Sequence, residues 1–171
     1  MNLILFILSF IIGFQECKKE NCNYFVFIFL NIFNVIFFVL NNEILFVLFP
    51  LLLSQCFIDF KKLELSNINS LFIFIFGIYF MRNNFDIKAI LFISLFYIIL
   101  YLLPFTNLGF GDVKLEIALS LFFNIVKVPS FIFYTLLISL IIGIIYKLKT
   151  RQSIFPMGPA IIFAFIIFHI I

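Results

Sequence analysis

Charged residues are scarce in this sequence: they make up 11% of its 171 residues, whereas 65% of the residues are hydrophobic. An ordinary soluble domain is about 45–50% apolar and about 25% charged. A soluble domain of this length has too little interior to bury so much apolar surface. The composition therefore excludes a soluble protein and predicts a single integral membrane domain over residues 1–171. Its expected fold class is all-α, a polytopic transmembrane helical bundle.

Histidine and cysteine, the usual ligands of zinc, are also scarce. His169 is the only histidine, and Cys17 and Cys22 form one isolated pair among three cysteines. A structural zinc site normally has four ligands, so we expect free thiols, no metal and no cofactor. His169 lies across the predicted membrane from the two aspartates discussed below, which disfavours a Ser-His-Asp triad.

The basic residues are too few and too scattered for a nucleic-acid partner. The net charge is only +3, and a nucleic-acid-binding protein would show a clustered basic face. The 30 phenylalanines follow no repeat period. They fit the bias of lipid-facing segments toward bulky apolar residues, and the expected partner is the lipid bilayer.

Eight apolar runs, separated by short polar breaks, predict about eight membrane helices. Several are shorter than the roughly 20 residues of a straight span, so six to eight spans are possible, and the first and fourth runs are the weakest. The runs cover residues 2–14, 24–40, 44–58, 68–81, 87–103, 113–126, 130–146 and 157–171.

The basic residues predict the orientation of these runs. If the runs alternate in direction, eight basic residues fall on one side and three on the other, and cytoplasmic loops retain Lys and Arg. Asp59, at the end of the third run, and Asp112, at the start of the sixth, then share the cytoplasmic side, with Asp86 opposite. The larger set is Lys18, Lys19, Lys61, Lys62, Lys114, Lys147, Lys149 and Arg151, and the smaller set is Arg82, Lys88 and Lys127.

Asp59 and Asp112 are the candidate catalytic residues. An unpaired carboxylate near hydrocarbon is costly and indicates a functional site. Two carboxylates a few ångströms apart cannot both ionise cheaply, so they share one proton. One then acts as general base on a water molecule while the other acts as general acid. This pair predicts peptide hydrolysis without a metal.

The residues before Asp112 predict a flexible loop. Gly109 and Gly111 lack a Cβ atom, so their backbone can adopt conformations closed to other residues and lie close to a substrate strand. Pro104 cannot donate a backbone hydrogen bond and helps to end the fifth helix. We therefore expect the segment from Pro104 to Gly111 to present Asp112 to the substrate.

The other charged residues are expected to be structural. Asp86 is predicted to cap the fifth helix, and Glu64 to be solvated among lysines. Lys114 can pair with a carboxylate, but snorkelling to phosphates is the commoner role for a lysine at a helix end. Glu116, one turn after Asp112, is expected to face the cytoplasmic headgroups rather than to tune the pair.

Residues 109–115, Gly-Phe-Gly-Asp-Val-Lys-Leu, resemble the Gly-x-Gly-Asp-x-Lys motif of type IV prepilin peptidases and preflagellin peptidases. Two further landmarks lie before and after this motif, in the order that the family has them. Ile58-Asp59-Phe60 is expected to open a basic loop that runs to Asn67, and residues 156–160, Pro-Met-Gly-Pro-Ala, resemble the Pro-x-Gly-Pro that starts the last helix. The landmarks cover a peptidase-like core of approximately residues 44–171.

The resemblance implies a membrane aspartic endopeptidase with Asp59 and Asp112 as its catalytic residues. Gly109, Gly111 and Lys114 would then be the supporting residues of the motif. It further implies that the enzyme lies in the inner (plasma) membrane and faces the cytoplasm. There it would cleave the basic leader from pilin-like or pseudopilin precursors.

The sequence departs from the family pattern at two places. Leu65-Ser66-Asn67 stands where the family usually has Ile-Pro-Asn or Ile-Pro-Asp, so the proline is lost. Larger members also carry a cytoplasmic insertion with paired CxxC motifs and an N-methyltransferase activity. The corresponding loop, residues 15–23, is short, and we expect no methylation.

Two other functions are compatible with parts of the sequence. A non-catalytic membrane protein, such as a transporter or a pilus or secretion assembly subunit, would use the aspartates for an ion path. A protease of the presenilin or signal peptide peptidase type shares Gly-x-Gly-Asp, but it expects Tyr-Asp where this chain has Ile58-Asp59. A cleavage assay separates the transporter from the peptidases. The sequence does not define the precursor or the oligomeric state.

Overall fold

The computed structural model describes residues 2–32, 34–40, 42–82, 84, 86–103, 108–150 and 154–170, and every regular element in these ranges is an α-helix. The predicted all-α fold class is confirmed. The described helices are α1 (Asn2–Lys19), α2 (Tyr24–Ile32), α3 (Val35–Val39), α4 (Glu43–Lys62), α5 (Asn67–Met81), α6 (Ile87–Leu102), α7 (Phe110–Ser120), α8 (Val128–Thr150) and α9 (Gly158–Ile170).

Each predicted apolar run overlaps at least one helix, but several boundaries differ. The second run contains two helices, α2 and α3. The helices α1 and α4 continue past their apolar runs into charged residues, to Lys19 and Lys62. In contrast, α7 ends at Ser120, and residues 121–126, which the sixth run predicted as helix, form turns and irregular structure.

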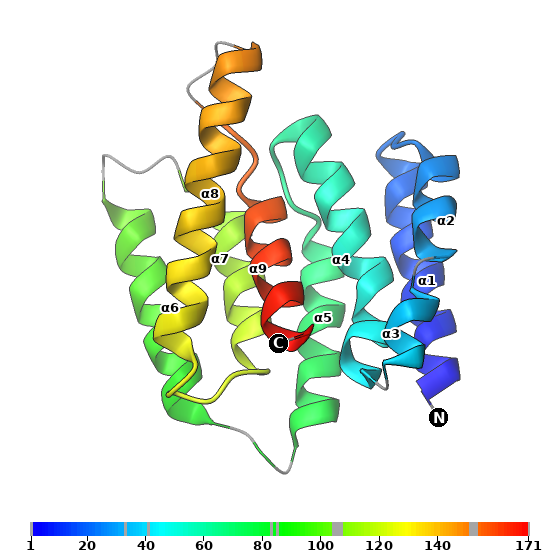
Figure 1. Ribbon diagram of the computed structural model, residues 1–171, viewed down its shortest axis with the longest axis horizontal. Helices are drawn as coiled ribbons and strands as arrows, with labels where there is room; N and C mark the ends of the chain where they lie inside the picture. Colours follow the sequence, from blue (N-terminus) through cyan, green and yellow to red (C-terminus); the bar gives the residue numbers. More distant parts are fainter. Residues whose placement is uncertain are drawn as a thin grey trace.

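The helices run up and down beside one another (Figure 1). The helix α4 lies in the middle and packs against α1, α5 and α9, while α7 packs against α5, α6 and α9. The chain alternates in direction, so the end of α4 and the starts of α5, α7 and α9 lie at the same end of the bundle (Figure 1). We call this end the site end.

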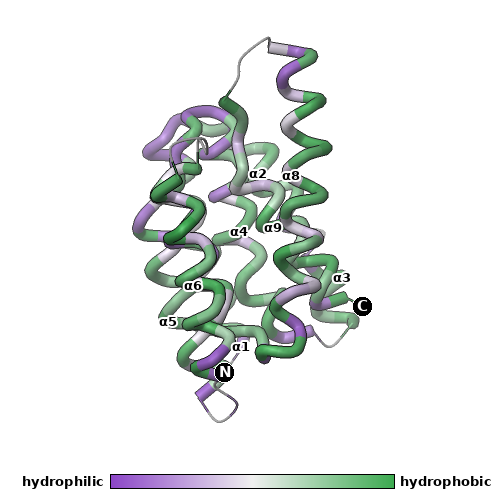
Figure 2. The backbone as a smooth tube through the Cα atoms, turned by 90° about the vertical axis from the view of Figure 1, so that its left-hand side faces the viewer, coloured by the Kyte–Doolittle hydropathy of each residue, from purple (hydrophilic) through white to green (hydrophobic). Residues whose placement is uncertain are grey.

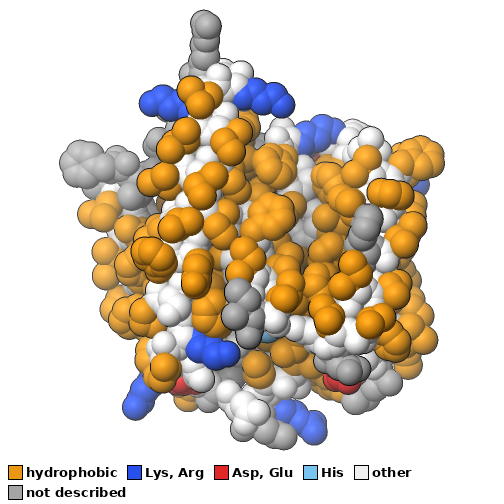
Figure 3. Space-filling view, in the orientation of Figure 1, with side chains coloured by type: hydrophobic (Ala, Val, Ile, Leu, Met, Phe, Trp, Pro, Cys, Tyr) orange, Lys and Arg blue, Asp and Glu red, His pale blue; other side chains and the backbone are white. Residues whose placement is uncertain are grey.

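The surface of the bundle is apolar around its middle and charged at its ends. Figure 3 shows hydrophobic side chains over most of the visible face, with Lys and Arg gathered near both ends, and Figure 2 shows the same banding along the backbone. Exposed residues such as Leu91, Leu95 and Leu140 are more than 60% accessible. Monomers in water rarely expose contiguous apolar patches of more than a few hundred Å², so this belt fits lipid.

Two described helices, α4 and α8, are long and apolar enough to cross a membrane. The shorter apolar segments are Tyr24–Val39, α5, α6 and α9. The interior between them is closely packed: Leu48, Leu52, Leu119 and Phe165 have no exposed surface. Because lipid is as apolar as this core, such contacts stabilise a membrane bundle mainly through van der Waals packing.

Candidate active site

Asp59 lies in the last turn of α4 and is 3% exposed. The helix continues for three residues beyond it, to Lys62, and the left-handed conformation of the next residue, Leu63 (φ 57°), stops the helix. The sequence predicted that Asp59 opens a loop, and this is wrong. The carboxylate is held instead by a regular helix, and the loop to α5 is only four residues long, from Leu63 to Ser66.

The carboxylate of Asp59 accepts a hydrogen bond from the first residue of α9. The N–H of Gly158 donates to Asp59 Oδ2 at 2.7 Å, across 99 positions of the chain. The start of a helix carries partial positive charge, so it favours a carboxylate there. A Cβ atom on Gly158 would lie 2.8 Å from Asp59 Oδ2 and 2.8 Å from Leu65 Cδ2. Only glycine permits this approach without a shift.

Asp112 lies in the first turn of α7 and is 9% exposed. Its Oδ2 accepts the N–H of Gly109 at 3.2 Å, as the third residue of a helix does in a capping box. Its Oδ1 is buried and has no hydrogen-bond partner in the part of the chain that the structure describes. One oxygen is thus fixed by the backbone while the other remains available.

The two glycines of the motif serve close packing rather than unusual backbone conformations. Gly109 has φ −74° and ψ 145°, which any residue adopts, and no described glycine has a positive φ. The expected conformational role is therefore wrong. Gly111 matters for space, because its Cβ would lie 3.1 Å from Leu65 Cβ. Gly111, which was predicted to lie in the loop, is the second residue of α7, and Pro104 lies outside the described residues.

Asp59 and Asp112 line the same cavity, which has a volume of about 270 Å³. The two side chains also interact electrostatically. The structure thus brings together the two aspartates that the sequence singled out. The other lining residues come from the α4–α5 loop, the start of α5 and the start of α7: Leu63, Glu64, Leu65, Asn67, Gly109, Phe110 and Gly111.

Lys114 connects α7 to α5 beside this cavity. Its Nζ donates to Asn67 Oδ1 at 2.8 Å and lies 4.7 Å from the centre of the Phe110 ring. These contacts differ from both sequence expectations, because the amine forms no ion pair with a carboxylate of the described residues and is engaged within the protein rather than extended toward phosphates. Lys114 therefore helps to fix the relative position of the two helices that border the cavity.

Ser66, which stands where the family pattern has proline, keeps a backbone conformation that proline would adopt. Its φ is −69°, and proline is restricted to about −65 ± 15°. Hydrogen bonds now hold this conformation. The N–H of Ser66 donates to Gln55 Oε1 at 2.8 Å, Gln55 Nε2 donates to Ser66 O at 2.9 Å, and the serine hydroxyl donates to Glu16. Sequence reasoning missed Gln55 and Glu16.

Glu116 also differs from its predicted position. It has no exposed surface and faces Tyr97 of α6 in the interior, so the expectation that it faces the headgroups is wrong. The sequence did contain one signal, since Glu116 follows Asp112 by four residues and therefore shares its helix face.

Cys17 and Cys22 are free thiols that lie together in a small cluster with Phe27 and Ile58. Within the described residues, no three His, Cys, Asp or Glu side chains gather in the manner of a metal site.

The fold and the cavity together indicate a class of protein. An apolar helical bundle with two buried carboxylates in one cavity is typical of a membrane protein with a polar site at one end. A family model described as the type IV leader peptidase family matches residues 46–148. Because this match covers more than half of the sequence, the chain belongs to the type IV leader peptidase family. No curated protein and no solved structure matches the chain.

Family membership gives the function at a coarse level: a membrane-associated peptidase that processes prepilin-like substrates. The matched segment contains Asp59 and Asp112. Gly158 of α9, which binds Asp59, lies outside it, and so does Glu16 of α1, which binds Ser66 in the α4–α5 loop. The structure therefore extends the candidate site beyond the segment that the family model covers.

Proposed function

We propose that this protein is an aspartic endopeptidase that removes the basic leader from type IV pilin-like precursors. Asp59 and Asp112 are its catalytic pair, and Gly109, Gly111 and Lys114 position Asp112. The observation that carries the proposal is the shared cavity, into which two buried carboxylates come from helices far apart in the sequence. The family membership supports the same reaction class.

The proposed reaction needs only the two carboxyl groups and one water molecule. One carboxylate takes a proton from the water, and the resulting hydroxide oxygen bonds to the scissile carbonyl carbon. The other carboxyl group gives its proton to the peptide nitrogen, the C–N bond breaks, and the amine leaves. The shared proton belongs to the pair, so we assign neither role to a single aspartate.

The hydrogen bonds around the pair prepare it for these steps. The N–H of Gly158 holds one oxygen of Asp59, and the N–H of Gly109 holds one oxygen of Asp112. A fixed oxygen restricts rotation of the carboxylate and leaves the second oxygen for water or substrate. Such positioning removes part of the entropic barrier to reaction.

We further propose that the site end faces the cytoplasm and that the apolar helices lie together in the inner (plasma) membrane. Asp59, Lys61 and Lys62 share the last turns of α4, and the ends of α1 and α8 at the same end carry Lys18, Lys19, Lys147 and Lys149. Arg82, Lys88 and Lys127 lie at the other end, and Arg151 lies outside the described residues. A basic leader then stays in water while the following apolar segment of the precursor enters lipid.

A cleavage assay tests the catalytic pair. Membranes that contain the full chain are incubated with a precursor that has a basic leader and an apolar helix, and mass spectrometry locates the cut. Asp59→Asn and Asp112→Asn are each expected to lower cleavage by at least about 10³-fold, as the loss of a catalytic group does in other proteases. Immunoblots of the membrane fraction confirm that each variant is inserted.

The matched control is Asp86→Asn at the opposite end, which should cleave within about twofold of the unmodified protein, because surface changes away from the site have small effects. Cleavage retained by either of the first two variants would overturn the assignment of the pair. A transporter or assembly subunit would show no cleavage with any of these proteins.

A further inference from the structure

A second hollow, mostly apolar, lies between α5 and α7 and has a volume of about 200 Å³. We call it the α5–α7 groove. It is open to the outside, because Leu71 on its rim is 55% exposed, whereas Ser70 and Ala118 beneath are only 6% and 2% exposed. The groove is lined by Ser70, Leu71, Phe74, Lys114, Ile117 and Ala118.

The α5–α7 groove continues the site cavity along the same two helices. Asn67 of α5 and Phe110 of α7 line the site cavity. Leu71 and Phe74 follow Asn67 by four and seven positions, so they lie on the same face of α5, and Lys114 follows Phe110 by four positions on α7. The hydrogen bond from Lys114 Nζ to Asn67 Oδ1 lies at the border between the two hollows.

Close packing closes the groove farther along α5. A Cβ atom on Gly77, seven residues after Ser70, would lie 2.7 Å from Leu121 Cδ1 and 3.2 Å from the Phe122 ring. The two segments leave no room between them there. From Asn67 to Gly77 a helix rises roughly 15 Å, about half of the roughly 30 Å hydrocarbon core of a bilayer. The groove therefore has space for about three turns of another helix.

The other neighbour of the site cavity is polar. A cavity of about 320 Å³ lies toward α1 and shares Glu64, Leu65 and Asn67 with the site cavity. Its further charged lining residues are Glu16, Lys19, Glu20 and Lys62. A charged segment is costly to place in an apolar groove. A polypeptide bound at Asp59 and Asp112 thus has a polar way out toward α1 and an apolar way out between α5 and α7.

We propose that the α5–α7 groove binds the first turns of the precursor's apolar helix, so that the substrate crosses Asp59 and Asp112 with its leader toward α1. This inference rests on the proposed peptidase function. The position of the groove selects this occupant over a lipid tail, because the groove begins at the cavity that holds the scissile bond. The apolar segment of the precursor starts at the same point.

The binding would use the ordinary contacts between helices in lipid. Small side chains let helix backbones approach closely, and van der Waals packing then stabilises the pair. Ser70 and Ala118 supply the small side chains, while Leu71, Phe74 and Ile117 supply the apolar surface around them. A helix held in this way also fixes the extended segment before it, which places the scissile bond at the aspartates.

Photo-crosslinking tests where the precursor lies. Benzoylphenylalanine replaces Leu71 in the full-length Asp59→Asn protein, which is expected to bind the precursor without cutting it. The matched control carries it at Leu140, which is 62% exposed on α8, a helix that packs against α6 and α9. After irradiation of membranes that contain the precursor, position 71 should give at least about tenfold more adduct than position 140, a preference of about 1.4 kcal/mol.

Kinetics test whether the groove contributes to substrate binding. Leu71→Trp fills the groove and should raise KM for the precursor by about tenfold, the effect of one badly fitting group in an apolar pocket, with kcat within about twofold. A peptide that contains the leader and the cleavage site but lacks the apolar helix should be cleaved equally by Leu71→Trp and the unmodified protein. Leu140→Trp should leave the cleavage of both substrates unchanged.

Equal adducts at positions 71 and 140, or adducts with lipid alone, would overturn the inference. An unchanged KM for Leu71→Trp, or an equal loss with both substrates, would also contradict it. If Leu71→Trp fails to insert, the adducts decide. Absence of cleavage by the unmodified protein would instead refute the proposed function, while the adduct at position 71 would still show whether the groove holds the precursor.

Discussion

The two ends of the bundle use the same residue types in opposite ways. At the end away from the site, the carboxylate of Asp86 accepts hydrogen bonds from the N–H groups of Lys88 and Ala89, which caps α6 as predicted, and its second oxygen accepts the N–H of Ile125 at 2.7 Å. At the site end, Asp112 uses one oxygen and leaves the other without a partner in the described structure.

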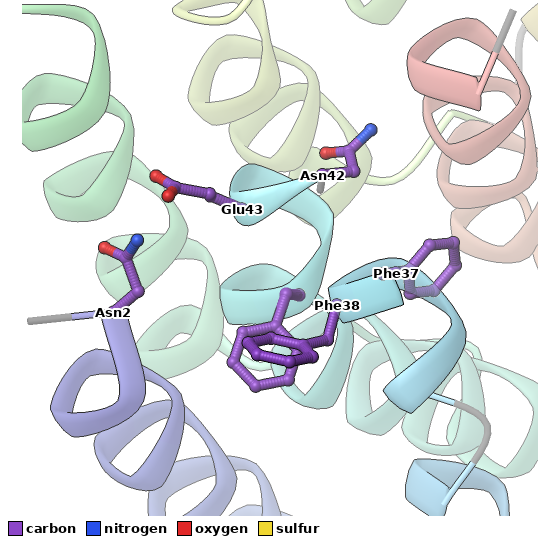
Figure 4. Close-up of a pocket in the computed structure, with 6 residues that line it drawn as sticks. Asn2, Phe37, Phe38, Asn42 and Glu43 are labelled. Atoms are coloured by element: carbon purple, nitrogen blue, oxygen red, sulfur yellow. The ribbon is translucent and has the colours of Figure 1, made fainter. Parts of the chain in front are cut away.

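Asn42, at the end away from the site, likewise uses both its amide oxygen and its amide nitrogen in hydrogen bonds. Its Oδ1 accepts the N–H of Leu45 and caps α4, while its Nδ2 donates to His169 O at 2.7 Å and joins α4 to the end of α9. The pocket beside it has a volume of about 70 Å³, roughly a quarter of the site cavity, and phenylalanine rings make up much of its lining (Figure 4).

The difference distinguishes Asp112 from Asp86 and Asn42. Buried polar groups that only stabilise a fold are nearly always fully hydrogen-bonded, and each exception calls for an explanation. At the end away from the site, Asp86 and Asn42 close the ends of helices. At the site end, Oδ1 of Asp112 has no hydrogen-bond partner in the described structure, although Asp112 lines the cavity.

The largest effect among the remaining variants is expected at Gly158. A Cβ in Gly158→Ala would meet Asp59 Oδ2 at 2.8 Å and displace either the carboxylate or the start of α9. A displacement of about 1 Å in a catalytic group costs about 10²-fold in rate, and the measurement is kcat for precursor cleavage.

Gly77→Ala provides a control with a comparable clash toward the other end of α5, where the new Cβ would lie 2.7 Å from Leu121 Cδ1. It should lower the melting temperature but leave cleavage per folded molecule within about twofold, as expected for a change remote from the site. Equal losses of cleavage in both variants would remove the distinction between the two ends.

A smaller effect is expected when Ser66 is replaced by the proline of the family pattern. Ser66→Pro keeps the backbone conformation but removes the N–H that Gln55 accepts and the hydroxyl that Glu16 accepts. Leaving a buried partner unsatisfied costs about 1–3 kcal/mol, so this variant should be less stable and cleave more slowly. Denaturation and cleavage assays on the same preparation measure both effects.

Two companion variants sharpen this result. Ser66→Ala keeps the N–H and should lose less stability than Ser66→Pro. Adding Gln55→Leu to Ser66→Pro should increase the loss, because the Gln55 amide still donates to the carbonyl of residue 66 and to Ser70 Oγ. An unchanged or more stable Ser66→Pro variant would show that the hydrogen bonds contribute nothing to the loop.

The amide at the opposite end should affect stability without affecting the reaction. Asn42→Ala removes a helix cap and the contact with the end of α9. The loss of a cap costs about 0.5–2 kcal/mol, which a melting curve detects, while cleavage per folded molecule should stay constant. A specific loss of kcat would mean that this end also takes part in the reaction.

The smallest effect concerns Asp86 and is lost in acid. The N–H of Ile125, followed by those of Ala89 and Lys88, holds the pKa of Asp86 below its ordinary value of 3.8. A carboxylate with a lowered folded-state pKa stabilises the fold above the unfolded pKa, and this contribution is lost as the pH falls through the folded pKa. The melting temperatures of Asp86→Asn and the unmodified protein should therefore differ at neutral pH and converge in acid.

Hydropathy and helix counting predicted much of this arrangement. The eight apolar runs identified the helical segments, and the parity of the two intervening helices placed Asp59 and Asp112 at one end. The extent of α4 past Asp59 was not predicted, because the charged residues that follow, Lys61 and Lys62, were taken as loop although they are also favourable in the last turn of a helix.

The sequence could not predict how each helix is rotated about its axis. Helices in lipid are apolar on both their buried and their outer faces, so they lack the amphipathic pattern that shows which side is buried. Glu116 was therefore assigned to the headgroups although it faces Tyr97. The bonds from Gly158 to Asp59 and from Ser66 to Glu16 connect residues 99 and 50 positions apart, and no local pattern encodes such pairs.

The hydrogen bond between Gly158 and Asp59 also sets an order of events during synthesis. A ribosome adds about 5–20 residues per second, so residue 158 is made about 5–20 s after residue 59. During this interval Asp59 already lies on α4 but lacks its donor from α9. The nascent chain thus holds both aspartates before the site is complete, and the docking of α9 is the step that assembles it.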